Sequence, residues 1–271
     1  MRFILLSIIA LVQSCLARVD QTGAGSRAAA LGGACTAVGG DIWSIAFNPG
    51  GLSLLERYQV SFFYSPSPFG IRELSTKECA AGIRSPFGVF GIAARAFGYR
   101  LYREVSGTIS YATSIPRAGF GVALNYHSVN ITRYGSAAAL AVDAGALIEG
   151  PAGLRFGLSV KNATAATLGV SREPLPQVYS IGLSCAPAEE LLLAADFRKE
   201  SGYEASPRIG LEYRIAGAIA IRMGIPDAVS EFAGGLGVGY GPLQLDYALT
   251  VHQELGWTHD VTLTVGGGKQ P

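Results

Sequence analysis

The sequence carries little charge and contains no long uninterrupted apolar run. Only 15% of its 271 residues are charged, against about 25% in an average soluble domain. The 21 basic and 20 acidic residues give a formal net charge of +1, which excludes the electrostatic signature of a nucleic-acid-binding protein. Low charge with 49% hydrophobic residues excludes intrinsic disorder. Apolar runs end before the roughly 20 residues that a membrane-spanning helix requires.

Cysteine is also scarce. The chain has four cysteines, at Cys15, Cys35, Cys79 and Cys185, and no pair has a C-x-x-C spacing. This pattern argues against a disulfide framework and against a structural zinc site. We interpret the last three cysteines as small hydrophobic residues.

What the chain does have is apolar character and glycine. Mean hydropathy is +0.32 and there are 36 glycines. An apolar chain without a spanning helix can cross a membrane only as a closed β-barrel, because every backbone polar group must be paired inside lipid. The composition therefore predicts a transmembrane barrel.

Alternation of side chains supports that prediction from residue 57 onward. In residues 153–161, for example, Leu154, Phe156, Leu158 and Val160 alternate with small or charged residues, which is the period of a strand. We predict an all-β fold, an antiparallel barrel of about fourteen strands. These strands are expected near 58–65, 77–84, 88–97, 105–113, 118–128, 138–147, 153–161, 177–185, 191–199, 207–214, 217–224, 231–239, 243–250 and 259–266.

The connections between these strands form a second pattern. Longer connections alternate with turns of a few residues such as Ser85-Pro86-Phe87 and Gly241-Pro242. Outer-membrane barrels have an even strand number with short periplasmic turns and longer outer loops. We therefore expect both termini to be periplasmic.

The two faces of the predicted strands differ in chemistry. The apolar face is expected to contact lipid, where Arg or Lys at mid-depth costs about 2–4 kcal/mol. The opposite face would point its charges into the lumen: Arg95, Arg155, Asp196, Arg198, Arg208, Glu212, Arg214, Arg222 and Asp246. Tyrosines near strand ends are typical of interfacial girdles.

The first residues read as a targeting segment. Met1-Arg2 precedes an apolar stretch, and small residues at Cys15 and Ala17 fit a cleavage site, so residues 1–17 are predicted to be a signal peptide. Acylation of Cys15 is the alternative, although Gln13 fits a lipobox poorly. The expected organisation is then a plug segment at 18–56, the barrel at 57–266 and a short tail at 267–271.

The segment 18–56 does not alternate. Gly23-Ala24-Gly25-Ser26-Arg27-Ala28 matches a dinucleotide-binding pattern, but the strand and βαβ unit that would give it meaning are missing. Ser26 could cap a short Ala-rich helix. Asn48, Pro49, Gly50 and Gly51 predict a turn in which Pro fixes φ and Gly supplies positive φ. A barrel of this width needs material in its lumen, so we expect this segment to form a plug or hatch.

Both ends of the chain resemble a known family. The run Gly23–Val38, then Asp41 and Asn48-Pro49-Gly50-Gly51-Leu52, is similar to the N-terminal signature of the PorV/PorQ family, within the FadL-like outer-membrane barrels. Residues 207–265 also resemble it, above all Gly241–Ala248. The resemblance implies a fourteen-stranded barrel with an N-terminal plug. The chain departs from it by ending without a terminal aromatic residue and by having short outer loops.

Two functions follow from the resemblance, and a third class is disfavoured. The first is a bacterial outer-membrane accessory protein that docks exported proteins or a secretion translocon. The alternative is a FadL-like transporter of small hydrophobic molecules. An enzyme is not expected: His252, Glu254, His259 and Asp260 lie close in sequence, but no hydrolase or metalloprotease motif contains them. No cofactor is predicted, and the expected partners are outer-membrane lipid, a translocon or exported protein, or a hydrophobic molecule.

Overall fold

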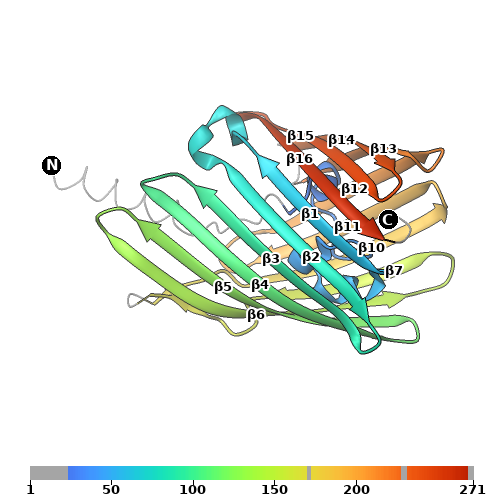
Figure 1. The fold of residues 1–271 in the computed structure, drawn as a ribbon, viewed down its shortest axis with the longest axis horizontal. Coiled ribbons are helices and arrows are strands. Elements are labelled where there is room, and N and C mark those ends of the chain that lie inside the picture. The colour runs from blue at the N-terminus through green and yellow to red at the C-terminus, as the bar shows by residue number, and fades with distance from the viewer. Residues whose placement is uncertain (1–23, 170–171, 227–230, 268–271) are drawn as a thin grey trace.

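The computed structural model describes residues 24–169, 172–226 and 231–267, and the predicted signal peptide lies outside these ranges. Fourteen strands of the described chain close into one antiparallel barrel (Figure 1). Each strand pairs with its neighbour in sequence, and the ring closes where Tyr58 of the first strand lies opposite Gly267 of the last. The barrel strands are β1 (Tyr58–Ser65), β2 (Thr76–Ser85), β3 (Gly88–Gly98), β4 (Tyr102–Ile115), β5 (Ala118–Ile131), β6 (Gly135–Glu149), β7 (Leu154–Lys161), β10 (Val178–Ala188), β11 (Leu191–Glu200), β12 (Ala205–Ile215), β13 (Ile219–Ile225), β14 (Glu231–Tyr240), β15 (Leu243–His252) and β16 (Gly256–Gly267). The predicted fold class is therefore confirmed.

Strands β4, β5 and β6 are longer than the alternation predicted. Polar residues such as Arg103, Asn130 and Ser136 interrupt the apolar pattern but still pair in the ladders. These three strands project beyond their neighbours at one end of the barrel (Figure 1). The connections after β3 and β5 are accordingly shorter than expected. We call this end the long-loop end and the opposite one the short-turn end.

The connections at the long-loop end contain small elements that alternation did not predict. The β1–β2 connection forms two 3-10 turns, η2 (Pro68–Gly70) and η3 (Arg72–Leu74). The β7–β10 connection contains a two-stranded hairpin of β8 (Thr167–Leu168) and β9 (Glu173–Pro174). No helix of the described residues is long and apolar enough to span a bilayer.

The two faces of the wall follow the alternation. Along β1 the exposed residues alternate strictly with buried ones, and the exposed set is apolar. The exterior exposes, among others, Leu158, Leu211 and Leu245, whereas the lumen side buries Glu212 and Asp246. The exposed tyrosines include Tyr58, Tyr64, Tyr99, Tyr111, Tyr126, Tyr179, Tyr213 and Tyr240.

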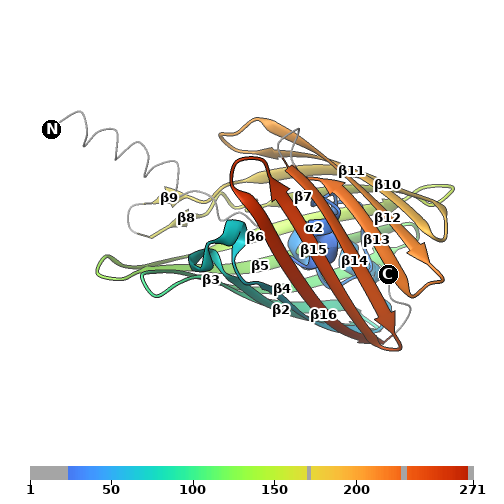
Figure 2. The same ribbon diagram turned by 90° about the horizontal axis from the view of Figure 1, so that it is seen from above.

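The apolar core lies inside the barrel rather than within its wall. Residues 24–56 form α2 (Ser26–Ala30), α3 (Ser44–Phe47) and η1 (Pro49–Leu54), and Figure 2 shows α2 within the ring of strands, behind β15. Ile42, Leu52 and Leu55 of this segment pack with Phe63 and Val89 of the wall. A second cluster joins Leu31, Ala34 and Val38 to Ala194. The segment thus supplies the apolar surface that the lumen-facing side of the strands lacks.

Candidate functional site: the lumen and its N-terminal segment

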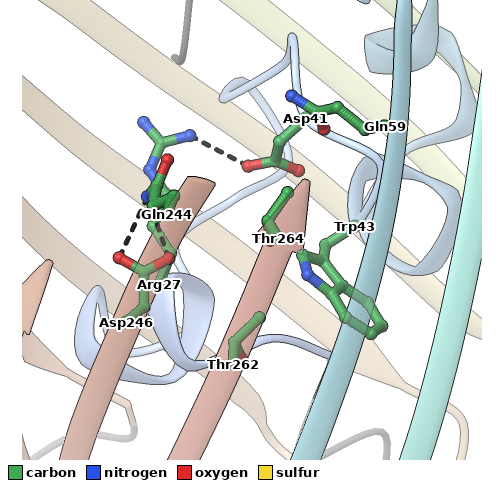
Figure 3. A pocket seen from close by; sticks show the side chains of 8 residues that line it. All are labelled: Arg27, Asp41, Trp43, Gln59, Gln244, Asp246, Thr262 and Thr264. Carbon is green, nitrogen blue, oxygen red and sulfur yellow. Dashed lines mark hydrogen bonds and ion pairs between the residues drawn. The ribbon is translucent and has the colours of Figure 1, made fainter. Parts of the chain in front are cut away.

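Arg27 is the main polar contact between the segment and the wall. Its Nε and Nη2 atoms donate to the two carboxylate oxygens of Glu212, at 2.8 and 3.1 Å, and Nη1 donates to Asp41 Oδ2 at 2.9 Å. Figure 3 shows Arg27 and Asp41 facing each other above the strands that carry Asp246 and Thr262. Burial by itself lowers the pKa of Arg27, but Glu212 and Asp41 outweigh it and raise the pKa above its ordinary value. The guanidinium is therefore charged.

Glu212 also belongs to a network of charged side chains that joins β12, β13 and β15 of the wall. Arg222 of β13 donates to Glu212 at 2.6 Å, and Arg214 donates to it at 2.7 Å. Arg222 in turn donates to Asp246 of β15 at 2.6 Å, and Gln244 donates to the same carboxylate at 2.8 Å. We call Arg27, Asp41, Glu212, Arg214, Arg222 and Asp246 the ionic cluster. It contains three positive and three negative side chains, so the desolvated charges balance.

The other predicted lumen charges are distributed around the ring. Arg95 pairs with Glu78 at 3.1 Å, and Arg198 with Glu200 at 3.3 Å. Arg208 lies against Gly33 of the segment. The least buried is Arg155, which lies 3.8 Å from Glu149 near the short-turn end.

Asp196 of the wall binds the segment through a backbone hydrogen bond rather than an ion pair. Its Oδ2 accepts the backbone N–H of Thr36 at 2.8 Å. Ser26 likewise contacts the wall: its hydroxyl lies 2.8 Å from Thr262 Oγ1. The expectation that Ser26 caps α2 is wrong, because Gly25 is the N-cap residue and the Ser26 hydroxyl is committed to β16.

The predicted turn at Asn48 is a junction between the segment and β6. Asn48 Nδ2 donates to the carbonyls of Thr36 and Ala146, at 2.7 and 2.9 Å, and Oδ1 accepts from the Gly50 N–H at 3.0 Å. Pro49 begins η1. The expected positive φ at Gly50 and Gly51 is not found. Gly50 is required for space instead, since a Cβ there would lie 2.9 Å from the Ala146 Cα atom.

Wall glycines receive the segment all around the lumen. A Cβ at Gly157 would lie 2.0 Å from the Thr36 carbonyl oxygen, and one at Gly145 would lie 2.0 Å from Asn48 Oδ1. Real Cβ atoms do not approach so closely, so these positions exclude every side chain. We call the lumen-facing set the glycine track: Gly82, Gly119, Gly121, Gly145, Gly157, Gly210, Gly224 and Gly235. Alternation in residues 153–161 predicts that Gly157 faces inward, but it gives no sign of what Gly157 contacts.

A cavity of about 320 Å³ separates the segment from the connections of the long-loop end. The segment contributes small residues and Phe47, the connections contribute Phe69, Leu74 and Leu255, and β3 contributes Phe97. The three phenylalanines come from α3, η2 and β3 and share no local pattern, so the sequence alone does not mark them as a group. The size of the cavity is typical of a small-molecule site.

His252, His259 and Asp260 make separate contacts and do not converge on one site. His252 Nδ1 accepts the backbone N–H groups of Glu254 and Leu255, both at 3.1 Å, and so stabilises the β15–β16 turn. His259 lies on the outer face, 2.7 Å from the Tyr247 hydroxyl. Asp260 faces the opposite way and is buried. Among the described residues no cluster of His, Cys, Asp and Glu could hold a metal ion.

Comparison with known proteins gives matches by structure alone. No protein-family model matches, and no curated protein sequence matches. A FadL homologue of Pseudomonas aeruginosa aligns with a TM-score of 0.61 at 11% identity, over 90% of this chain and 98% of that one. The Pseudomonas putida toluene transporter TodX aligns with a TM-score of 0.60 at 10% identity, over 85% and 95% of the two chains. This chain shares the fold of these two solved barrels. Omp33 of Acinetobacter baumannii is also similar, with a TM-score of 0.51 at 8% identity over 78% of this chain and 98% of that one.

Proposed function

We propose that this protein is a bacterial outer-membrane channel for small hydrophobic molecules, with its long-loop end facing outward. The apolar exterior supports a bilayer location, since a closed barrel leaves no unpaired edge in lipid. The observation that carries the transport function is the 320 Å³ cavity, which has three phenylalanines and the small residues of α2 around it. The similar folds include a toluene transporter, which supports the same reading.

The segment 24–56 would act as the plug of this channel. It fills the lumen beneath the cavity, with Asn48, Pro49, Gly50 and Gly51 fixing η1 against β6. A molecule in the cavity would pass only when part of the segment moves. The domain boundary proposed at residues 56–57 fits this arrangement, because β1 begins at Tyr58.

Docking of exported proteins, which the PorV/PorQ resemblance implied, has less support. The similar solved structures include a FadL homologue and a toluene transporter, and the cavity is of small-molecule size. We therefore place transport first and export docking second. His252 and His259 make separate contacts, which gives no support to an enzymatic role.

The test is uptake of radiolabelled toluene by proteoliposomes that have lipopolysaccharide in the outer leaflet. Ala29 lines the cavity from α2, so Ala29→Trp fills the space and should abolish most protein-dependent uptake. Ala144 is on the exposed exterior of β6, and Ala144→Trp should leave uptake at the wild-type level. Wild-type uptake no greater than in protein-free vesicles would contradict the proposed function.

A further inference from the structure

Three hydroxyl or carboxyl side chains form a row on neighbouring strands where the wall meets the cavity. Ser65 of β1 lies opposite Thr76 of β2 in the strand register. Tyr64 lies opposite Val261 of β16, so the next residues, Ser65 and Asp260, are also neighbours across the strands. All three members of the row line the cavity.

Two members of this row each have one buried side-chain oxygen without a well-formed hydrogen bond. Asp260 is 4% exposed and Ser65 is 3% exposed. The Ser65 hydroxyl lies within hydrogen-bonding reach of the Asp260 carboxylate, but neither Asp260 Oδ1 nor Ser65 Oγ has a partner of acceptable geometry in the part of the chain that the structure describes. Buried polar groups are nearly always paired, so these two atoms are suited to a donor from outside the chain.

The remaining lining decides which molecule could bring that donor. Phe47, Phe69 and Phe97 present aromatic surface to the same cavity, and aromatic rings pack favourably against one another in offset or edge-to-face arrangements. A cavity of about 150 Å³ already holds benzene, so 320 Å³ accommodates a substituted ring. Three arginines and three carboxylates line the space, namely Arg95, Arg198, Arg208, Glu104, Glu231 and Asp260. This balance favours a neutral ligand.

We propose that the cavity binds a small neutral aromatic molecule with a hydroxyl group, which donates its proton in a hydrogen bond to the Asp260–Ser65 pair while the ring packs against the phenylalanines. The inference rests on the proposed transport function and specifies its substrate class. A plain hydrocarbon would fill the same space but would leave the buried acceptor unpaired. The site therefore discriminates by the hydroxyl group rather than by size.

The experiment compares p-cresol with toluene, which differ only by the hydroxyl group. Binding of each radiolabelled compound to the purified full-length protein is measured by equilibrium dialysis in detergent, with protein-free micelles subtracted. We expect p-cresol to bind about tenfold more tightly than toluene, because a hydrogen bond to a charged acceptor is among the stronger ones. Asp260→Leu should abolish this preference and leave toluene binding unchanged, and Ser65→Ala should reduce it.

Asp143→Leu is the matched control, because Asp143 is also a buried lumen aspartate but does not line this cavity. It should retain the preference for p-cresol. Equal binding of the two compounds by the wild type overturns this inference and leaves the transport proposal standing, as does a preference that survives in Asp260→Leu. If neither compound binds to the wild type, both proposals fail.

Discussion

At the scale of single residues, Arg27 connects the N-terminal segment to the barrel wall. It is the only member of the ionic cluster, in the described chain, that contacts both Asp41 of the segment and Glu212 of β12. Breaking a buried ion pair on one side leaves a charge without compensation, which costs far more than the net stabilisation of the intact pair. The cluster therefore fixes where the segment lies in the lumen.

Replacement of Arg27 by Met should lower the free energy of unfolding by about 3–5 kcal/mol. Urea unfolding in lipid vesicles, followed by tryptophan fluorescence, measures the change. Arg155→Met is the control, because its side chain is 36% exposed and 3.8 Å from Glu149, and such a pair contributes about 1 kcal/mol or less. Equal losses for the two variants would show that Arg27 has no special part in holding the segment.

Cys35 reports the position of the same segment. Burial raises the pKa of its thiol well above the ordinary value, and Asp196 and Asp41 raise it further. A raised pKa means less thiolate at any given pH below it, and the thiolate is the reactive form. A variant that retains only Cys35 should react with N-ethylmaleimide far more slowly at pH 8 when it is folded than when it is unfolded in urea, because Cys35 is buried in the folded protein. Rapid labelling of Cys35 in the folded protein would mean that the segment leaves the lumen readily; adding Arg27→Met should accelerate it.

At the scale of elements, close packing against the segment explains the eight glycines of the glycine track, out of 36 in the chain. Glycine inside a strand is normally unfavourable by roughly 0.5–1 kcal/mol relative to alanine. Here it allows the carbonyls of Thr36, Pro49 and Leu31 to approach the wall. Strands of the barrel and turns of the segment therefore fit together through backbone contact. This is a packing solution that a strand with larger side chains could not provide.

A single methyl group should be enough to disturb this fit. Gly157→Ala places a Cβ 2.0 Å from the Thr36 oxygen and should destabilise the protein by about 1–3 kcal/mol or displace the segment. Gly239 is also on the lumen side, but the nearest atom to a Cβ there is 3.8 Å away, so Gly239→Ala should be neutral or slightly stabilising. Unfolding midpoints and the labelling rate of Cys35 distinguish the pair. A Gly157→Ala protein with wild-type values in both assays would refute close backbone packing.

At the scale of the whole molecule, the barrel wall reverses the distribution of apolar and charged residues that is usual in water-soluble proteins. Its apolar residues face outward, its wall charges face inward, and its core consists of wall and segment residues together. Such an arrangement is stable only where lipid covers the exterior, because water would otherwise contact a continuous apolar surface. The outer surface thus determines the environment in which the chain folds.

Charge introduced on this surface should be penalised according to depth. Leu236 is 53% exposed in the middle of β14, and Tyr240 is 85% exposed at the short-turn end of the same strand. Leu236→Arg should lower the free energy of unfolding from vesicles by about 2–4 kcal/mol, and Tyr240→Arg by about 0–1 kcal/mol. The reverse order, or equal losses, would place the bilayer elsewhere on the barrel.

The sequence by itself determined the barrel, its strand number and which face of each strand is apolar, because alternation is a local signal repeated in every strand. It also indicated that residues 18–56 differ from the rest. Only the tertiary structure decided what each inward residue contacts. Glu212 and Arg27 form a hydrogen-bonded ion pair although they are 185 positions apart. The carbonyl of Thr36 leaves no room for a side chain at Gly157. Three phenylalanines from separate elements, Phe47, Phe69 and Phe97, line one cavity. No local pattern encodes such contacts, since closing the barrel brings together side chains whose spacing along the chain is arbitrary.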